Sequence, residues 1–213
     1  MEILPGVLAY DEADFKARIL HPGLQAVAKT FHVDVLDGSL FHATCWAEAR
    51  TVGSWNDVPD IELHCMVQSP LSVIEDWKDH VPSLRRVIVH QEIGRNLPST
   101  IARARQLQLE VMVAVNPGTP VDEIARLPID GLLVMGVEPG ASGQTFLGEP
   151  ILSKVRRAKS LFPNLTVALD GGVSRQNIGS LAQTGLARCV ASSALWKAEK
   201  PEEAYKILLS KSR

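Results

Sequence analysis

The sequence has 213 residues, of which 46% are hydrophobic and 22% are charged, so we expect one large core and a single domain over residues 1–213. The formal net charge of −2 provides no general basic surface, which argues against nucleic acid as a partner. No apolar run reaches the length of a membrane span, and the first residues lack the pattern of a signal peptide. The three scattered cysteines (Cys45, Cys65 and Cys189) suit free thiols in a reducing compartment, so we predict a cytoplasmic protein without membrane contact.

Short and almost continuously apolar segments alternate with helical patterns along the whole chain. Such segments are typical of parallel strands that are buried on both faces. We expect strands at residues 2–9, 31–36, 61–66, 86–90, 110–115, 131–135, 165–170 and 188–192. Eight strands alternating with helices in a chain of this length favour an eight-stranded parallel (β/α)8 barrel, the TIM barrel, over a doubly wound sheet.

Prolines and capping residues mark the starts of the predicted helices. Helices are expected to begin at or just after Pro98, Thr119, Glu149, the segment 174–177 and Pro201. In the helix that begins at Glu149, the basic residues Lys154, Arg156, Arg157 and Lys159 are expected on the solvent-exposed side. The segment 38–60 is predicted to contain only a short helix or an irregular loop.

Polar side chains interrupt three of the apolar strands. His32 and Asp34 are two residues apart, so on a strand they share one face, with Cα atoms roughly 6.5 Å apart. His64 and Asp170 lie near the carboxyl ends of two later strands, at the edge where such sheets bind ligands. Each could be a hydrogen-bonded core residue, but two imidazoles and two carboxylates together suit Zn²⁺, with Fe²⁺, Mn²⁺ or Co²⁺ as alternatives. The sequence therefore predicts that the four side chains converge on one divalent ion.

Three consecutive strands, the sixth to the eighth, are followed by segments suited to an anion. Residues 136–144 form a long glycine-rich loop, and 170–173 and 191–194 follow the next two strands. Backbone N–H groups of such loops, and the helix N-termini after them, can bind phosphate oxygens. Alone, each segment is read as an ordinary turn, but three in succession predict a phosphate site. These segments contain no Lys or Arg, so amide dipoles are expected to supply the positive charge.

In these motifs the chain resembles the ribulose-phosphate 3-epimerase family over nearly its whole length. The resemblance is carried, in specific order and spacing, by the segments 31–38 (which includes His-Val-Asp-Val-Leu-Asp-Gly), 63–66 (Leu-His-Cys-Met), 116–120, 135–146 and 170–173. It implies that His32, Asp34, His64 and Asp170 are metal ligands and that Asp34 and Asp170 are also the catalytic acid/base pair.

The resemblance also implies a phosphorylated ketose as substrate. The residues expected to contact its phosphate or sugar are Gly6, Met66, Met135, Gly140, Gly143, Gln144, Gly171, Gly172, Ser192 and Ser193. Met66 and Met135 would give the site polarizable, uncharged walls, although plain core packing explains them equally well. We further expect a homo-oligomer.

The reaction that this resemblance implies is the interconversion of D-ribulose 5-phosphate and D-xylulose 5-phosphate by a metal-dependent isomerase. Removal of the proton beside the carbonyl gives an enediolate, whose charge a divalent cation can stabilise. If one carboxylate removes the proton from one face and a second returns a proton to the opposite face, the carbon centre is inverted. Asp34 and Asp170 would supply these two carboxylates.

The chain departs from the family pattern around this site. Gly6 stands in place of a serine, Leu36 in place of a third methionine, and Ser192 in place of a glycine. The lid-like loop 140–143 reads Gly-Ala-Ser-Gly instead of Gly-Phe-Gly-Gly, and 39–44 lacks a Phe-Val-Pro-Asn run. All four expected ligands are present, so the departures concern substrate shape, closure and rate more than epimerisation itself.

Three functions remain open on the sequence. The first is an epimerase of ribulose 5-phosphate or of a related hexulose 6-phosphate. The second is a phosphate-anchored lyase of the same barrel type, which would carry an Asp-x-Lys-x-x-Asp cluster; the sequence has none, and Lys29 and Lys78 are expected on helices. The third is a non-catalytic phosphosugar-binding barrel, which the altered loops favour slightly and the complete ligand set disfavours.

Overall fold

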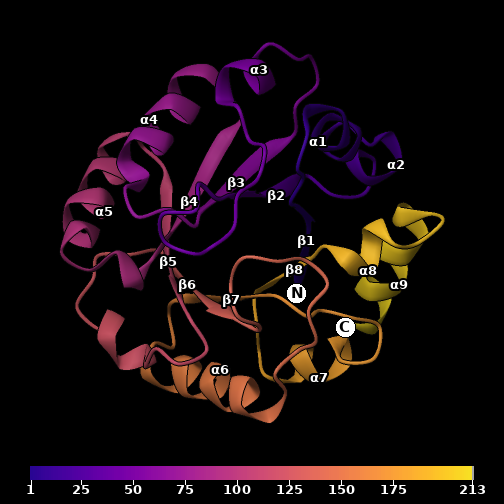
Figure 1. The fold of residues 1–213 in the computed structure, drawn as a ribbon. Coiled ribbons are helices and arrows are strands. Elements are labelled where there is room, and N and C mark those ends of the chain that lie inside the picture. Colours follow the sequence, from indigo (N-terminus) through magenta and orange to yellow (C-terminus); the bar gives the residue numbers. More distant parts are fainter. Residues whose placement is uncertain (213) are drawn as a thin grey trace.

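The computed structural model describes residues 1–212, which form a closed barrel of parallel strands with helices around it (Figure 1). The strands are β1 (Glu2–Val7), β2 (Thr30–Val35), β3 (Asp60–Cys65), β4 (Leu84–His90), β5 (Glu110–Val115), β6 (Gly131–Met135), β7 (Thr166–Asp170) and β8 (Arg188–Ala191). Each strand pairs in parallel with the next, and β8 closes the barrel against β1. The predicted eight-stranded (β/α)8 barrel is confirmed, and every predicted strand overlaps an observed one.

The helices lie outside the barrel and connect successive strands (Figure 1). They are α1 (Glu12–Ile19), α2 (Pro22–Gln25), α3 (Ala49–Gly53), α4 (Pro70–His80), η1 (Gln91–Asn96), α5 (Leu97–Gln106), η2 (Val121–Ile124), α6 (Glu149–Leu161), α7 (Ile178–Gln183), α8 (Ser193–Trp196) and α9 (Pro201–Lys211). Within residues 1–212, none of these helices combines the length and the apolar character needed to cross a bilayer.

Two helix predictions were wrong in detail. The segment after Thr119 forms only the short 3₁₀ helix η2, because Pro128 disfavours a helical conformation at the residue before it. Lys29 is not on a helix; it lies between α2 and β2. Lys78 does lie on a helix, α4. The absence of an Asp-x-Lys-x-x-Asp cluster does not depend on these assignments.

The solvent-exposed face predicted for α6 is only partly correct. Arg156 and Arg157 are exposed, as expected. Lys154 instead turns toward the loop after β5, where its Nζ donates to the carbonyl oxygens of residues 116, 117 and 119 at 2.6–2.7 Å. Partial burial lowers the pKa of Lys154. Its ammonium therefore fixes this loop and is not a free anion site.

Alternation along the strands divides the buried side chains between two cores. Outward-facing residues such as Val33, Val35 and Cys65 join the large core under the helices, as predicted for Cys65. A second cluster fills the inside of the barrel: Ile88, Met112, Ala114, Leu133, Met135 and Ala168. Each fully buried aliphatic side chain stabilises the fold by about 1.5–3 kcal/mol. Because these residues fill the barrel interior, the barrel is a packed core rather than a pore.

Charged side chains close the amino-terminal end of the barrel. Arg86 Nε donates to Glu62 Oε2 at 2.8 Å, and Arg188 lies 3.2 Å from Glu2 and 2.7 Å from Glu110. Loss of one partner from a buried ion pair costs on the order of 3–5 kcal/mol, because the other charge is left uncompensated. Arg86 thus holds Glu62 in place below the carboxyl end of the barrel.

Candidate metal centre and substrate pocket

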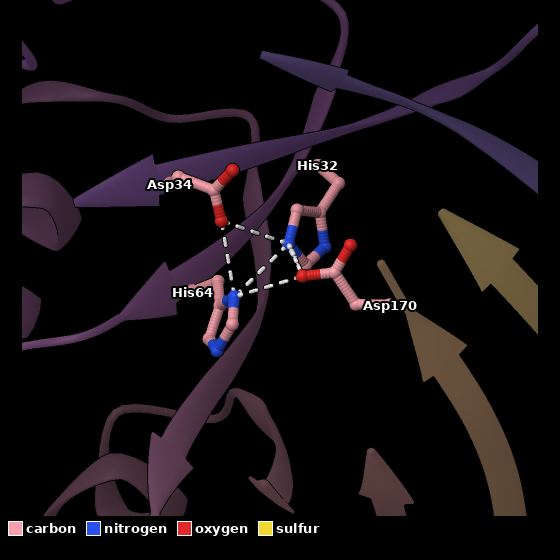
Figure 2. A group of neighbouring side chains, drawn as sticks. All are labelled: His32, Asp34, His64 and Asp170. Carbon is pink, nitrogen blue, oxygen red and sulfur yellow. Dashed lines mark hydrogen bonds and ion pairs between the residues drawn. The ribbon is translucent and has the colours of Figure 1, made fainter. Parts of the chain in front are cut away.

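Four side chains from three strands meet at the carboxyl end of the barrel (Figure 2). His32 and Asp34 come from β2, His64 from β3 and Asp170 from β7, and one ligand atom of each lies within 4.8 Å of the others. Asp34 pairs with His64 across neighbouring strands, and strand alternation puts His32 on the same face as Asp34. The structure therefore brings together all four residues that the sequence singled out as ligands.

The spacing of the ligand atoms fits a single metal ion. His64 Nδ1 lies 3.0 Å from Asp34 Oδ1 and 3.7 Å from Asp170 Oδ2. His32 Nε2 lies 3.2 Å from His64 Nδ1 and 3.3 Å from Asp34 Oδ1. Two atoms that are each about 2.1 Å from an ion lie roughly 3.0–3.4 Å apart in octahedral or tetrahedral coordination. The four residues could hold one divalent ion with small adjustments, the largest at Asp170.

Glu62 sets the orientation of His32. Its Oε1 lies 2.7 Å from His32 Nδ1, and its Oε2 accepts from Arg86. Burial tends to raise the pKa of Glu62, but the hydrogen bond to His32 and the neighbouring positive charges outweigh burial and lower it. An ionised Glu62 accepts a hydrogen bond from the N–H of His32 Nδ1. This leaves Nε2 as the ring nitrogen that can offer a lone pair to a bound ion, as a metal-binding imidazole requires.

The carboxyl groups of Asp34 and Asp170 are shifted in opposite directions. Burial favours the neutral form of both. At Asp34, hydrogen bonds to His32 and His64 outweigh burial and hold the pKa well below its usual range. At Asp170, burial dominates and the Asp34 charge adds to it, so the pKa is raised. Two acids whose pKa values are pushed apart can divide the roles of proton acceptor and proton donor.

A cleft opens above these carboxylates. Asp34 and Asp170 form part of its wall. Of the ten residues expected to contact substrate, nine lie in this wall: Met66, Met135, Gly140, Gly143, Gln144, Gly171, Gly172, Ser192 and Ser193. The sequence interpretation had left Met66 and Met135 between pocket and core, and they are buried residues that also border the cleft.

Gly6 is the one expected contact residue that does not border this cleft. It faces the strand ends of β8 so closely that a Cβ atom there would lie 2.8 Å from Val190 Cγ1 and 3.2 Å from Ser192 Cβ. Gly6 and Ser192, two of the departures from the family pattern, are therefore neighbours in space. Where the family has a serine, residue 6 has no side chain; where the family has a glycine, residue 192 has a serine side chain.

Glycines let the loops after β6 and β7 approach each other. Gly171 and Gly172 have φ values of 103° and 71°, and a Cβ atom on Gly172 would lie 2.6 Å from the backbone of Phe146. In the described residues, no backbone carbonyl accepts a hydrogen bond from the amides of Gly143 or Gly172. These amides lie beside the cleft without a backbone acceptor, so the phosphate site expected from the glycine-rich loops stays a prediction that this arrangement permits.

The helix N-termini that were expected to assist these amides contribute little. The helix α8 after β8 has only four residues, and α7 begins at Ile178, beyond the turn that follows Gly172. A cation is present instead. A Cβ atom on Gly143 would lie 3.2 Å from Lys197 Nζ, so this ammonium stands beside the predicted phosphate loop. Lys197 lies three residues beyond the last of the segments expected to bind phosphate, so the sequence analysis does not include it.

Side chains of the loop after β6 hold it in shape. Gln144 Nε2 donates to the backbone oxygens of Glu138 and Ala141, so this amide nitrogen is used within the loop and not free for substrate. The Ser142 and Ser192 hydroxyls are 3.1 Å apart and join the loop to the end of β8. Leu36, where a methionine was expected, packs with Leu8 and Met66 in a small apolar cluster.

Two polar side chains that the sequence analysis does not single out contact the candidate ligands His32 and His64. Glu62 lies two residues before His64 on β3, and this spacing alone could have indicated a shared face. His90 ends the apolar run of β4, and its Nε2 lies 2.9 Å from His64 Nε2. His90 enters the sequence analysis only as the last residue of the strand 86–90. Arg86, Ile88 and His90 are spaced two residues apart, so they share the inward face of this strand.

Comparison with known proteins agrees with this site. The Ribulose-phosphate 3 epimerase family matches residues 2–196. The chain belongs to this family. It is 33% identical over 215 residues to the ribulose-phosphate 3-epimerase of Mycobacterium tuberculosis, covering 97% of this chain and 90% of the relative. It is 32% identical over 208 residues to the enzyme of that name from Schizosaccharomyces pombe (95% and 90%) and 30% identical over 217 residues to the cytoplasmic isoform of Oryza sativa (97% and 92%).

Solved structures share the fold of this family member. A mutant tryptophan synthase alpha-subunit from Pyrococcus furiosus superimposes with a TM-score of 0.70 at 18% identity, covering 99% of this chain and 95% of that chain. Phosphoribosyl anthranilate isomerase from Thermus thermophilus gives a TM-score of 0.67 at 18% identity, covering 99% and 98%. At this identity the likeness concerns the fold alone.

Proposed function

We propose that this member of the epimerase family interconverts D-ribulose 5-phosphate and D-xylulose 5-phosphate by inverting C3 in a metal-dependent reaction. One observation carries the proposal: Asp34 and Asp170 contact the same two histidines, and their pKa values are shifted in opposite directions. Relatives named ribulose-phosphate 3-epimerase, which match nearly the whole chain, support the choice of substrate.

The two carboxyl groups divide the proton transfers. Asp34, whose pKa is lowered, accepts the C3 proton as a carboxylate, and Asp170, whose pKa lies above that of Asp34, returns a proton to the opposite face of the enediolate. In the reverse direction the two residues exchange roles. A divalent ion held by His32, Asp34, His64 and Asp170 would stabilise the negative charge of the enediolate. Zinc suits this mixed nitrogen and oxygen set, with Fe²⁺, Mn²⁺ and Co²⁺ as alternatives.

The cleft above the carboxylates supplies the rest of the binding site. The side chains of Met66 and Met135 form uncharged walls that exclude water from the reacting carbon without competing for its proton. The amides of Gly143, Gly172 and Ser193 bind the substrate phosphate, and the Lys197 ammonium adds the positive charge that the loops themselves lack.

We further infer that residues 1–213 form a single domain of a homo-oligomeric enzyme that acts in the cytoplasm. The closed barrel from β1 to β8 supports one domain, and the name of the rice relative, a cytoplasmic isoform, supports the compartment. Light scattering after size-exclusion chromatography tests the oligomer, and a molar mass of one chain would contradict it.

Metal analysis combined with an assay for xylulose 5-phosphate tests the function. Protein purified without chelators should contain about one divalent ion per chain and convert ribulose 5-phosphate. The variant His64→Ala should lose both properties. Asp37→Asn, which removes an exposed carboxylate just beyond β2, is the matched control and should keep both. Retained metal with activity only toward a hexulose 6-phosphate would select the alternative substrate, and binding without turnover would select a phosphosugar-binding protein.

A further inference from the structure

A row of buried hydrogen bonds leads away from His64 on the side opposite the ligand cluster. His64 Nε2 lies 2.9 Å from His90 Nε2, and His90 Nδ1 lies 3.1 Å from Glu92 Oε2. Both imidazoles are fully buried. Their ring planes differ by 14° and their centroids are 5.0 Å apart, while the two nitrogens are much closer. The rings therefore lie edge to edge in nearly one plane, as an N–H···N hydrogen bond requires.

When His64 Nδ1 binds a metal ion, only one distribution of protons satisfies both the contact between the two imidazoles and the contact of His90 with Glu92. His64 Nδ1 faces the point at which the four side chains would share an ion, between Asp34 and Asp170. To bind an ion there, Nδ1 must carry a lone pair, and the ring proton must then be on Nε2. That proton is donated to His90 Nε2, which leaves the His90 proton on Nδ1, where it is donated to Glu92. Any other arrangement of two neutral rings puts two N–H groups or two lone pairs against each other.

Hydrogen bonds to the second carboxylate oxygen of Glu92, Oε1, hold this side chain in place. Glu92 Oε1 accepts from the backbone N–H of Asn116 at 3.0 Å and from the hydroxyl of Thr119. Burial tends to raise the pKa of Glu92, but these bonds and the one from His90 outweigh it and lower the pKa to about 2. The loop that supplies them is held by Lys154 on α6. Glu92 is thus an ionised, immobile acceptor.

We propose that His90 and Glu92 are positioning residues that hold His64 in the tautomer and orientation in which Nδ1 can bind a divalent ion. The inference rests on the metal-dependent function proposed above and extends it to residues that do not touch the ion. His32 is held directly by the carboxylate of Glu62, whereas His64 is held through a second imidazole. Phe41 covers the His90 ring edge to face at 4.9 Å, which shields the chain of hydrogen bonds from water.

The test measures metal affinity directly. The dissociation constant for Zn²⁺ is determined by competition with a chromophoric chelator, and the absorption spectrum of the Co²⁺-loaded protein reports ligand geometry. In His90→Leu, which removes both hydrogen bonds, the affinity for Zn²⁺ should fall by about 10–100-fold and the Co²⁺ spectrum should change. His90→Gln should recover most of the affinity, because its carboxamide can accept from His64 and donate to Glu92.

Two further variants separate positioning from stability. Ile88→Val removes a methylene from the same strand without touching the hydrogen bonds, so it should lower the melting temperature while leaving Zn²⁺ affinity unchanged. Glu92→Gln keeps an acceptor but loses the charge and should weaken Zn²⁺ binding less than His90→Leu does. If His90→Leu does not fold, a wild-type affinity in Glu92→Gln would overturn the proposal.

The outcomes distinguish this inference from the function on which it rests. Wild-type protein that binds no divalent ion would overturn both. Wild-type protein that binds one ion per chain, with equal affinity in His90→Leu, would overturn only the positioning role. An equal loss of affinity in His90→Leu and Ile88→Val would do the same, because the loss would then reflect general destabilisation.

Discussion

Asp34 and Asp170 contact the same two imidazoles although β1 and β8 separate their strands around the barrel. Asp34 is closer to the histidines and is held ionised, whereas the looser contacts of Asp170 leave burial to dominate. Closure of the barrel thus brings together two carboxyl groups of identical chemistry whose pKa values are shifted in opposite directions. This difference underlies the proposed division of labour between them.

Asp34→Asn and Asp170→Asn should each reduce epimerisation by at least about 10²–10⁴-fold, because each removes one of the two proton carriers. The variants should differ in single-turnover exchange of the C3 hydrogen with deuterated water, since the variant that keeps the base can still remove a proton. Both must be measured with metal restored to full occupancy. Near-normal turnover in metal-loaded Asp170→Asn would rule out the two-carboxylate mechanism.

Lys197→Met should raise the KM for the phosphorylated substrate by about tenfold with little change in kcat, because a charge-assisted hydrogen bond of about 1.5 kcal/mol is lost in binding. Lys200→Met removes the same charge from an exposed position three residues away and is the control. Steady-state kinetics at fixed ionic strength supply the measurement. The same KM in Lys197→Met as in wild type would show that the loop amides bind the phosphate alone.

Gly6→Ser should destabilise the protein by about 1–3 kcal/mol, because its Cβ would lie 2.8 Å from Val190 Cγ1. Adding Val190→Ala should relieve part of this loss. Gly118→Ser is the control, since a Cβ atom there meets nothing within 4 Å, and its effect should stay within about 0.5 kcal/mol. The free energy of unfolding from urea titration checks all three. A Gly6→Ser variant as stable as wild type would mean that β8 moves aside readily.

Glu92 should make stability depend on acid pH. Its pKa is about 2 in the folded chain against an ordinary value of 4.5, so the unfolded state binds more protons between these values and stability falls as pH falls. Glu92→Gln lacks this titration. In metal-free protein, the difference in unfolding free energy between wild type and Glu92→Gln should be constant above about pH 5.5. Between pH 4.5 and 2 this difference should shrink by about 1–2 kcal/mol, a value that allows for solvent screening of the partly exposed carboxylate. A difference that does not change with pH would show that Glu92 is not held ionised.

The barrel and the ligand cluster could be predicted because both follow from short-range rules. Apolar runs of strand length define the strands, and a spacing of two residues puts His32 and Asp34 on one face. The carboxyl ends of parallel strands always meet at one edge, which brings in His64 and Asp170 from distant parts of the chain.

The remaining features depend on packing between segments that are remote in sequence. Nothing in the run that ends at His90 shows that its ring would lie in the plane of the His64 ring. The contact between Gly6 and Ser192 joins the two ends of the chain through the pairing of β1 with β8. Lys197 reaches Gly143 only because the short helix α8 returns beside the loop after β6. Each of these relationships is fixed by tertiary structure.

Hydrogen exchange at C3 of ribulose 5-phosphate in deuterated water tests the central claim most directly. Wild-type protein with its metal should incorporate one deuterium at C3 of the xylulose 5-phosphate formed, as seen by NMR. Chelator-treated protein should incorporate none, and added Zn²⁺ should restore the exchange. If the metal-loaded wild type forms no xylulose 5-phosphate and exchanges no hydrogen at C3, epimerisation of this substrate through Asp34 and Asp170 is contradicted.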